Sequence, residues 1–118
     1  MTELDPEDTK LVTLARSARS RAHVPYSGAA EGAAVRDTDG RTYAAATVEN
    51  SDDTHTTTAL RGAVVAAASS GARSFEAAVV VTDGGLRDDD VAVLREFGEG
   101  VPVILAGPDG VVRERAST

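Results

Sequence analysis

The chain has 118 residues, a formal net charge of −7 at neutral pH and no cysteine. This acidity argues against binding to the nucleic-acid backbone, which needs clustered Lys and Arg, and the lack of cysteine excludes disulfides and thiolate metal ligands. No apolar run approaches the roughly 18 residues of a membrane-spanning helix, and the acidic N-terminus is unlike a signal peptide, so we expect one soluble cytoplasmic domain over residues 1–118 without a membrane partner.

Three segments have the marks of helices. Each begins with acidic, proline or hydroxyl residues and continues with apolar residues three and four positions apart. Pro25 ends the first of them, and Gly71 follows the second. The predicted helices cover residues 5–24, 57–70 and 88–97.

Five further segments predict strands. The first two flank a hairpin-type turn at residues 37–40. The apolar run at residues 77–81 is typical of a strand that is buried on both faces. We expect about four residues at each end of the chain to be frayed. The predicted strands cover residues 31–35, 41–48, 75–82, 101–106 and 111–114.

The order of these elements predicts an α/β fold with three layers. Strands that alternate with helices imply crossover connections, and hence a mixed five-stranded sheet with helices on both faces. Right-handed crossovers place the starts of the second and third helices near the carboxyl ends of the strands, where ligands usually bind. Attention therefore falls on residues 49–60 and 83–90.

Six short segments resemble the small, tetrameric cytidine deaminases, and they occur in that family's order. The resemblance covers roughly residues 10–112 and implies the family's three-layer α/β/α fold. The segments are "VPYSGAAEGAAV" (24–35), "TVEN" (47–50), "ALRGAVVAA" (59–67), "VVVTD" (79–83), "VLREFG" (93–98) and "VPVIL" (101–105).

The departures from the family fall on its catalytic residues. In that family one Cys or His and two further Cys hold zinc, which activates a water, while a Glu shuttles protons. The resemblance places Thr58, Arg87 and Asp90 at the ligand positions and Leu60 at the Glu position. A neutral hydroxyl, a permanent cation and one carboxylate make a poor zinc site. We therefore expect no zinc, no other cofactor and no catalytic residue of the family's kind.

The resemblance also indicates candidate ligand contacts. Ala29 aligns with the family's aromatic residue against the pyrimidine, and Thr47 aligns with an Asn that holds the ribose. Glu49, the other ribose partner, remains, although it could instead cap backbone amides of the loop that follows it. Tyr26 and Ser27 either line the former pocket or pin the loop that carries them.

Other polar groups have structural interpretations. His55 and the acids at residues 52–53 are interpreted as solvated loop residues rather than as a metal site. The three acids at residues 88–90 suit the positive end of a helix. Arg61 lies beside the zinc thiolates in the family, and here we expect it to pair with Asp90 or another acid.

The sequence leaves several functions open. The favoured hypothesis is a zinc-free, inactive cytidine-deaminase-like protein that binds a nucleoside-like ligand or a protein partner. The alternatives are a cytidine or nucleoside deaminase with a rebuilt site, and a structural subunit of an active paralogue. Few aromatic residues and an Ala-rich second helix predict a homo-oligomer, either a tetramer or a dimer.

A final expectation concerns the place that zinc occupies in the family. Unpaired buried polar groups are costly, so side chains or water must fill that space. We expect the Arg87 guanidinium or the Asp90 carboxylate to point into it, within hydrogen-bond reach of the Thr58 helix start. Arg87 is also expected to reach towards Glu49.

Overall fold

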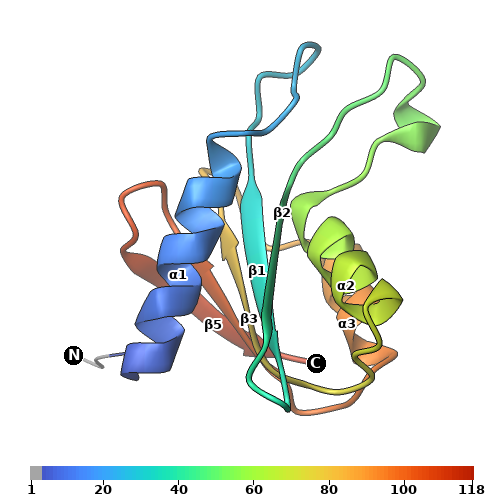
Figure 1. The fold of residues 1–118 in the computed structure, drawn as a ribbon. Helices are drawn as coiled ribbons and strands as arrows, with labels where there is room; N and C mark the ends of the chain where they lie inside the picture. Colours follow the sequence, from blue (N-terminus) through green and yellow to red (C-terminus); the bar gives the residue numbers. More distant parts are fainter. Residues whose placement is uncertain (1–3) are drawn as a thin grey trace.

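The computed structural model describes residues 4–118, which form a five-stranded sheet with helices on both faces (Figure 1). The predicted three-layer α/β architecture is confirmed. Among the described residues, no helix has the length and apolar character that crossing a membrane requires. The elements are α1 (Pro6–Arg19), β1 (Gly32–Asp37), β2 (Thr42–Ala46), a short 3-10 helix η1 (Asp53–His55), α2 (Ala59–Ser69), β3 (Phe75–Val81), α3 (Asp88–Arg95), β4 (Pro102–Ala106) and β5 (Val112–Ser117).

The sheet has the strand order β2-β1-β3-β4-β5, and only β3 and β4 are parallel. Gly32 pairs with Ala46 on one side and with Val81 on the other, and Val81 pairs with Ala106. The start of β1 therefore lies at the same end of the sheet as the carboxyl ends of β2, β3 and β4. Because α2 follows β2 and α3 follows β3, both helices begin near this end.

The helices cover the sheet unequally. Helix α1 lies on one face, and α2 and α3 lie on the other (Figure 1). The approach of α1 depends on Gly32, because a Cβ there would lie 2.0 Å from the carbonyl oxygen of Ala15 and 2.5 Å from the backbone nitrogen of Arg19. This contact fixes where β1 begins, and with it the position of the preceding residue, Glu31.

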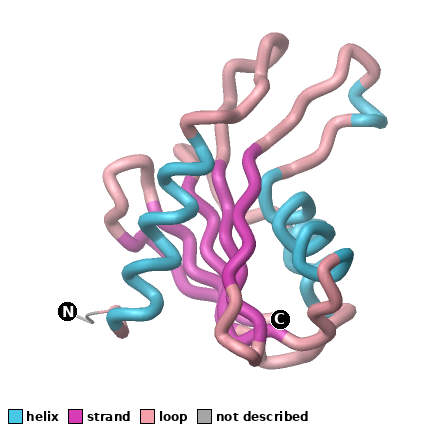
Figure 2. The backbone as a smooth tube through the Cα atoms, in the orientation of Figure 1, coloured by secondary structure: helices cyan, strands magenta, loops and turns pink. Residues whose placement is uncertain are grey.

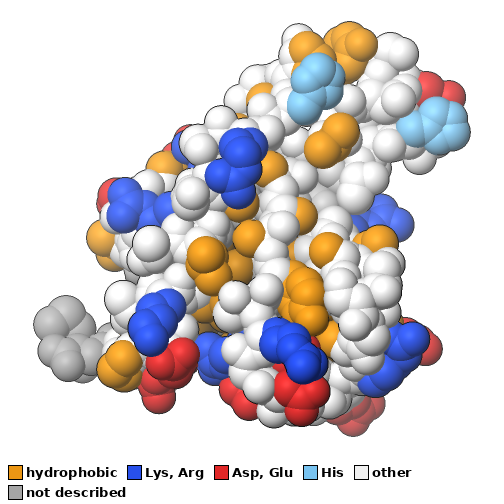
Figure 3. Space-filling view, in the orientation of Figure 1, with side chains coloured by type: hydrophobic (Ala, Val, Ile, Leu, Met, Phe, Trp, Pro, Cys, Tyr) orange, Lys and Arg blue, Asp and Glu red, His pale blue; other side chains and the backbone are white. Residues whose placement is uncertain are grey.

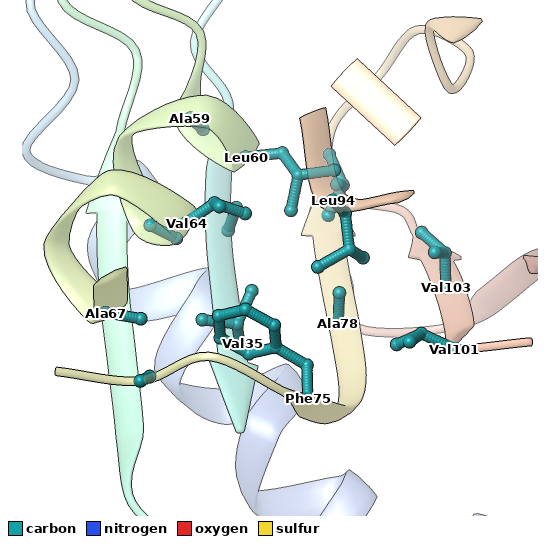
Figure 4. Packing of buried hydrophobic residues seen from close by; sticks show 14 of the residues in the cluster. Val35, Ala59, Leu60, Val64, Ala67, Phe75, Ala78, Leu94, Val101 and Val103 are labelled. Carbon is teal, nitrogen blue, oxygen red and sulfur yellow. The ribbon is translucent and has the colours of Figure 1, made fainter. Parts of the chain in front are cut away.

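The core between the sheet and α2 and α3 consists mainly of Ala, Val and Leu, as the composition indicates. Leu60 and Leu94 are both almost fully buried and meet where α2 faces α3 (Figure 4). Phe75 and Phe97 pack edge to face, with ring centroids 5.6 Å apart. The position that resembles the family's proton-shuttling Glu is therefore part of the hydrophobic core.

The carboxyl end of the chain differs from the expectation. Strand β5 continues to Ser117, so the prediction of about four frayed C-terminal residues is wrong. Ser117 pairs with Pro102, and the amide of Thr118 donates to the Val101 carbonyl at 3.0 Å. These backbone bonds stabilise the end against fraying. At the amino end, residues 1–3 lie outside the described part of the chain, whereas Leu4 packs against the α1 side of the core.

Two long connections extend past the sheet at the end where β1 begins, one over residues 20–31 and one over residues 47–58 (Figure 2). They are tied together by backbone hydrogen bonds. The amide of His23 donates to the Thr47 carbonyl at 2.9 Å, and the amide of Glu49 donates to the His23 carbonyl at 2.8 Å. This pairing ends α1 at Arg19, earlier than predicted, because the chain must leave the helix to meet the second connection.

Candidate functional site

A pocket of about 370 Å³ opens where these two connections meet the starts of α2 and α3. Most of the residues that line it were singled out by the sequence, whereas the candidates Tyr26, Ser27, Leu60 and Asp90 do not line it. Its lining is rich in charged and hydroxyl side chains, which suits a small polar ligand. The lining residues are Ala29, Thr47, Glu49, Asp53, Thr56, Thr58, Arg61 and Arg87.

Next to the pocket lies a network of polar side chains, which we call the Glu31–Arg87–Asp90 network. Asp90 is buried and accepts a hydrogen bond from the Thr58 hydroxyl at 2.8 Å. The Nη1 atom of Arg87 lies 2.8 Å from Glu31 Oε1 and 3.7 Å from Asp90 Oδ2. The hydroxyl of Thr82 donates to the other Glu31 oxygen at 2.9 Å. The expected contact between Asp90 and the start of α2 is therefore present.

The partner of Arg87 differs from the expectation. Arg87 pairs with Glu31 rather than with Glu49. Glu31 is 5% exposed, and sequence reasoning missed it. The available signal was a single charged residue within the apolar run "GAAEGAAV", because a charge in such a run must find a partner when it is buried.

Arg87 stays a cation in this network. Burial acts to lower the pKa of its guanidinium, but the charges and hydrogen bonds of Glu31 and Asp90 outweigh burial and raise the pKa above its ordinary value. The guanidinium thus offsets the negative charge of two buried carboxylates. Because about half of its side chain is exposed, Arg87 connects these carboxylates to the pocket.

The residues at the family's zinc position do not fit zinc. The Thr58 hydroxyl is a neutral donor directed at Asp90, and the Arg87 guanidinium would repel a divalent cation. Within residues 4–118, no group of three or more His, Cys, Asp or Glu side chains is placed to hold a metal ion. The side chain of Leu60 packs in the core and has no group that could move a proton.

Glu49 lines the pocket and also holds the connection at residues 20–31. Its Oε1 accepts from the amides of Tyr26 at 3.0 Å and Ser27 at 3.1 Å, and its Oε2 accepts from the Ser27 hydroxyl. The expected capping role is thus present, but the amides belong to the other connection and not to the loop after Glu49. The Ser27 hydroxyl, more than the two amides, holds the pKa of Glu49 below its ordinary value of 4.5, although burial opposes this.

Tyr26 and Ser27 have different roles. Ser27 pins its loop through Glu49 and through its hydroxyl, which accepts from the amide of Ala29 at 3.0 Å. The Tyr26 side chain is exposed and does not line the pocket. Of the two interpretations that the sequence left open for this pair, pinning of the loop describes the observed contacts.

Arg61 has no partner of the expected kind. Within residues 4–118 its guanidinium has no carboxylate within ion-pair distance, so the predicted pairing with Asp90 is wrong. The side chains that contact the Asp90 oxygens are instead those of Thr58 and Arg87. Arg61 is exposed in the first turn of α2 and lines the pocket.

The remaining polar candidates lie away from the network. His55 Nε2 is 3.6 Å from Asp52 Oδ2 in an exposed pair, and both histidines lie on the loops at one end of the molecule (Figure 3). Asn50 shapes its turn by accepting from the Asp52 amide at 2.9 Å. Hydrogen bonds from the hydroxyl and amide of Thr54 hold the pKa of Asp52 below its ordinary value of 3.8.

The chain is similar to known cytidine deaminases. A family model described as "Cytidine deaminase-like" matches residues 4–110. The structure is similar to that of a cytidine deaminase from Burkholderia pseudomallei, with 30% identity and a TM-score of 0.85 over 99% of this chain and 93% of that chain. It is also similar to a cytidine deaminase from Mycobacterium tuberculosis, with 29% identity and a TM-score of 0.77 over 93% of this chain and 91% of that chain.

A cytidine deaminase from Mycobacterium leprae has the same fold. It is 23% identical, with a TM-score of 0.78, over 92% of this chain and 93% of that chain. No curated protein matches the chain by sequence.

The network predicts a non-additive pair of substitutions. Arg87→Met leaves Glu31 buried without its cation and should lower the free energy of unfolding by about 2 kcal/mol, since removal of one partner from a buried pair strands the other charge. Adding Glu31→Gln should restore part of this loss. Urea unfolding of the two single variants and the double variant measures the coupling. Additive losses would show that the two side chains do not act together.

The Glu49 contacts predict a specific pH dependence. Because the folded state lowers the pKa of Glu49, the stabilisation of the Tyr26–Ser27 loop is complete above the ordinary value of 4.5 and disappears only as the pH falls through the lower, folded value. The NMR signals of the Tyr26 and Ser27 amides should therefore titrate with a midpoint below 4.5. In Glu49→Gln, this titration should be absent. A midpoint at or above 4.5 would contradict the assigned contacts.

Proposed function

The chain belongs to the cytidine deaminase-like family, and from that membership we propose that it binds a nucleoside-like ligand without zinc and without deaminating it. The supporting observation is the Glu31–Arg87–Asp90 network. Thr58, Arg87 and Asp90, which resemble the ligand positions of the family, are bonded to one another or to Glu31. They hold the starts of α2 and α3 together in the way that a metal ion does elsewhere.

The lost chemistry follows from the residues that remain. Deamination needs an activated water, and water that is not bound to a metal keeps a pKa near 15.7 instead of about 7. It also needs a group that moves protons, and the side chain of Leu60 is hydrocarbon buried in the core. A deaminase with a rebuilt site would need a positioned base in the pocket. The two carboxylates of the pocket do not meet this need, because Glu49 already accepts hydrogen bonds from three donors and Asp53 lies on an exposed loop.

The proposed ligand contacts are those that line the pocket. Glu49 presents carboxylate oxygens that can accept from sugar hydroxyls, and Thr47 is a buried hydroxyl residue at the end of β2. Ala29 provides a small apolar wall. A volume of about 370 Å³ lies at the lower end of the 300–1,000 Å³ range of small-molecule sites. The pocket therefore suits a small ligand of about nucleoside size.

Zinc content and ligand binding test this proposal together. After extensive dialysis, elemental analysis should find far less than one zinc per chain. In a thermal-shift measurement cytidine should raise the melting temperature, because a ligand selective for the folded state stabilises it, whereas zinc should not. The variant Thr47→Val should reduce the effect of cytidine, and Thr54→Val, at an exposed loop position outside the pocket lining, serves as its control. One tightly held zinc per chain would contradict the zinc-free proposal.

We also propose that the chain forms a homo-oligomer, as the Ala-rich second helix predicts. Val65 on α2 is 58% exposed, Ala66 beside it is exposed, and the neighbouring strand β2 is an edge of the sheet with Ala44 exposed. Apolar side chains are visible around β2 in the space-filling view (Figure 3). Small side chains of this kind allow close packing against a second copy. The same surface could bind an active paralogue, which is the structural-subunit alternative.

Light scattering at micromolar concentration tests the assembly. The expected mass is that of a tetramer or a dimer, and Val65→Arg should shift it to that of the monomer because a charge in an apolar interface is not solvated. Val111→Arg is a matched control, since Val111 is 61% exposed but lies away from α2. A monomer mass for the unaltered chain would refute the proposal.

A further inference from the structure

The charged side chains that line the pocket differ in how many of their polar atoms already have hydrogen-bond or ion-pair partners. Both oxygens of Glu49 accept hydrogen bonds from the neighbouring loop. Arg87 uses Nη1 for its carboxylate contacts, which leaves the Nε and Nη2 donors of the same guanidinium. Arg61 makes no ion pair or side-chain hydrogen bond among residues 4–118. The donors that remain for a ligand are therefore concentrated on two guanidinium groups.

The buried carboxylates hold one of these groups in place. Glu31 and Asp90, each with a side chain 6% exposed, both lie within ion-pair distance of Arg87 Nη1, and their charges favour the protonated guanidinium. A cation that is fixed before the ligand arrives loses less conformational entropy on binding. Arg87 is thus a rigid positive group at one wall of the pocket.

The start of α2 adds further donors beside the two arginines. Thr58 occupies the N-cap position, but its hydroxyl makes no capping bond and donates to Asp90 instead. The first backbone hydrogen bond of the helix runs from the Gly62 amide to the Thr58 carbonyl at 2.9 Å. Amides in this first turn are left for water or a ligand, and they favour negative charge.

We propose that the pocket binds the anionic group of its ligand, a phosphate or a carboxylate, between Arg61 and Arg87. This inference rests on the proposed function for the site but specifies the ligand as a small hydroxylated anion rather than a neutral nucleoside. A guanidinium binds either group through two parallel N–H bonds. The hydroxyls of the ligand can then donate to the carboxylates of Glu49 and Asp53, which also line the pocket.

The acidic residues set a limit on the size of the anion. The net charge of −7 and the carboxylate of Asp53 oppose the approach of highly charged ligands. A single phosphate or carboxylate on a sugar matches the two guanidinium groups, whereas the charge of a triphosphate exceeds theirs. The site is therefore selective for monophosphates or monocarboxylates of nucleoside or sugar size.

Calorimetric titration of the full-length chain in low salt tests this inference with matched probes. The first set of probes is cytidine with its anionic counterpart, cytidine 5′-monophosphate. The second set is ribose with its two anionic counterparts, ribose 5-phosphate and ribonate. Each anionic probe should bind at least about tenfold more tightly than its neutral counterpart, because hydrogen bonds to charged groups are the stronger ones. Tighter binding of ribose 5-phosphate than of ribonate identifies phosphate as the preferred group, and the reverse order identifies carboxylate.

Two variants that each remove one arginine distinguish binding at this site from a general effect of the net charge of the protein. Arg61→Gln should weaken the anionic probes about tenfold and leave the neutral ones unchanged, with little effect on the melting temperature because Arg61 is exposed. Arg95→Gln removes an exposed arginine at the far end of α3, outside the pocket lining, and should have no effect. Equal affinity within each pair of probes, or equal weakening by both variants, would overturn the inference.

The outcomes also separate this inference from the function on which it rests. If cytidine binds and cytidine 5′-monophosphate binds no more tightly, the inference fails and nucleoside binding stands. If ribose 5-phosphate binds through Arg61 and the base adds no affinity, the anion site stands and nucleoside recognition fails.

Discussion

The contact between Arg87 and two buried carboxylates is the constraint on which the site depends. Glu31 precedes β1, and Asp90 lies in the first turn of α3. Two carboxylates out of water are tolerated only with a cation and hydrogen-bond donors, and Arg87 with the hydroxyls of Thr58 and Thr82 supplies both. The network thereby joins the start of β1, the end of β3 and the starts of α2 and α3.

The same network explains the character of the pocket beside it. The Thr58 hydroxyl donates to Asp90 and makes no capping bond to α2, so the first amides of that helix are left for water or a ligand. Arg61 lines the same pocket as Glu49 and Asp53, but among residues 4–118 no carboxylate lies within ion-pair distance of its guanidinium. Two guanidinium groups therefore line the pocket, and the network holds one of them, Arg87, in place.

Much of the fold could be predicted from the sequence, whereas only part of the site could. Helical and strand periodicity located the elements, and the resemblance to the family placed Thr58 and Asp90 at two helix starts that meet. The pairing of Glu31 with Arg87 links residues 56 positions apart, and no local pattern specifies it. The ion pair expected for Arg61 was mispredicted because such a pair depends on the three-dimensional positions of side chains that are distant in the sequence. The length of β5 was underestimated because its polar, exposed residues are held by backbone pairing with β4, which side-chain pattern does not reveal.

The central claim is that a protein-only network replaces the metal chemistry of this family. Chromatographic measurement of uridine after prolonged incubation of the purified chain with cytidine and added zinc tests it most directly. The account predicts uridine at the level of a protein-free control. Uridine formation that increases in proportion to the protein and stops on addition of a chelator would contradict it.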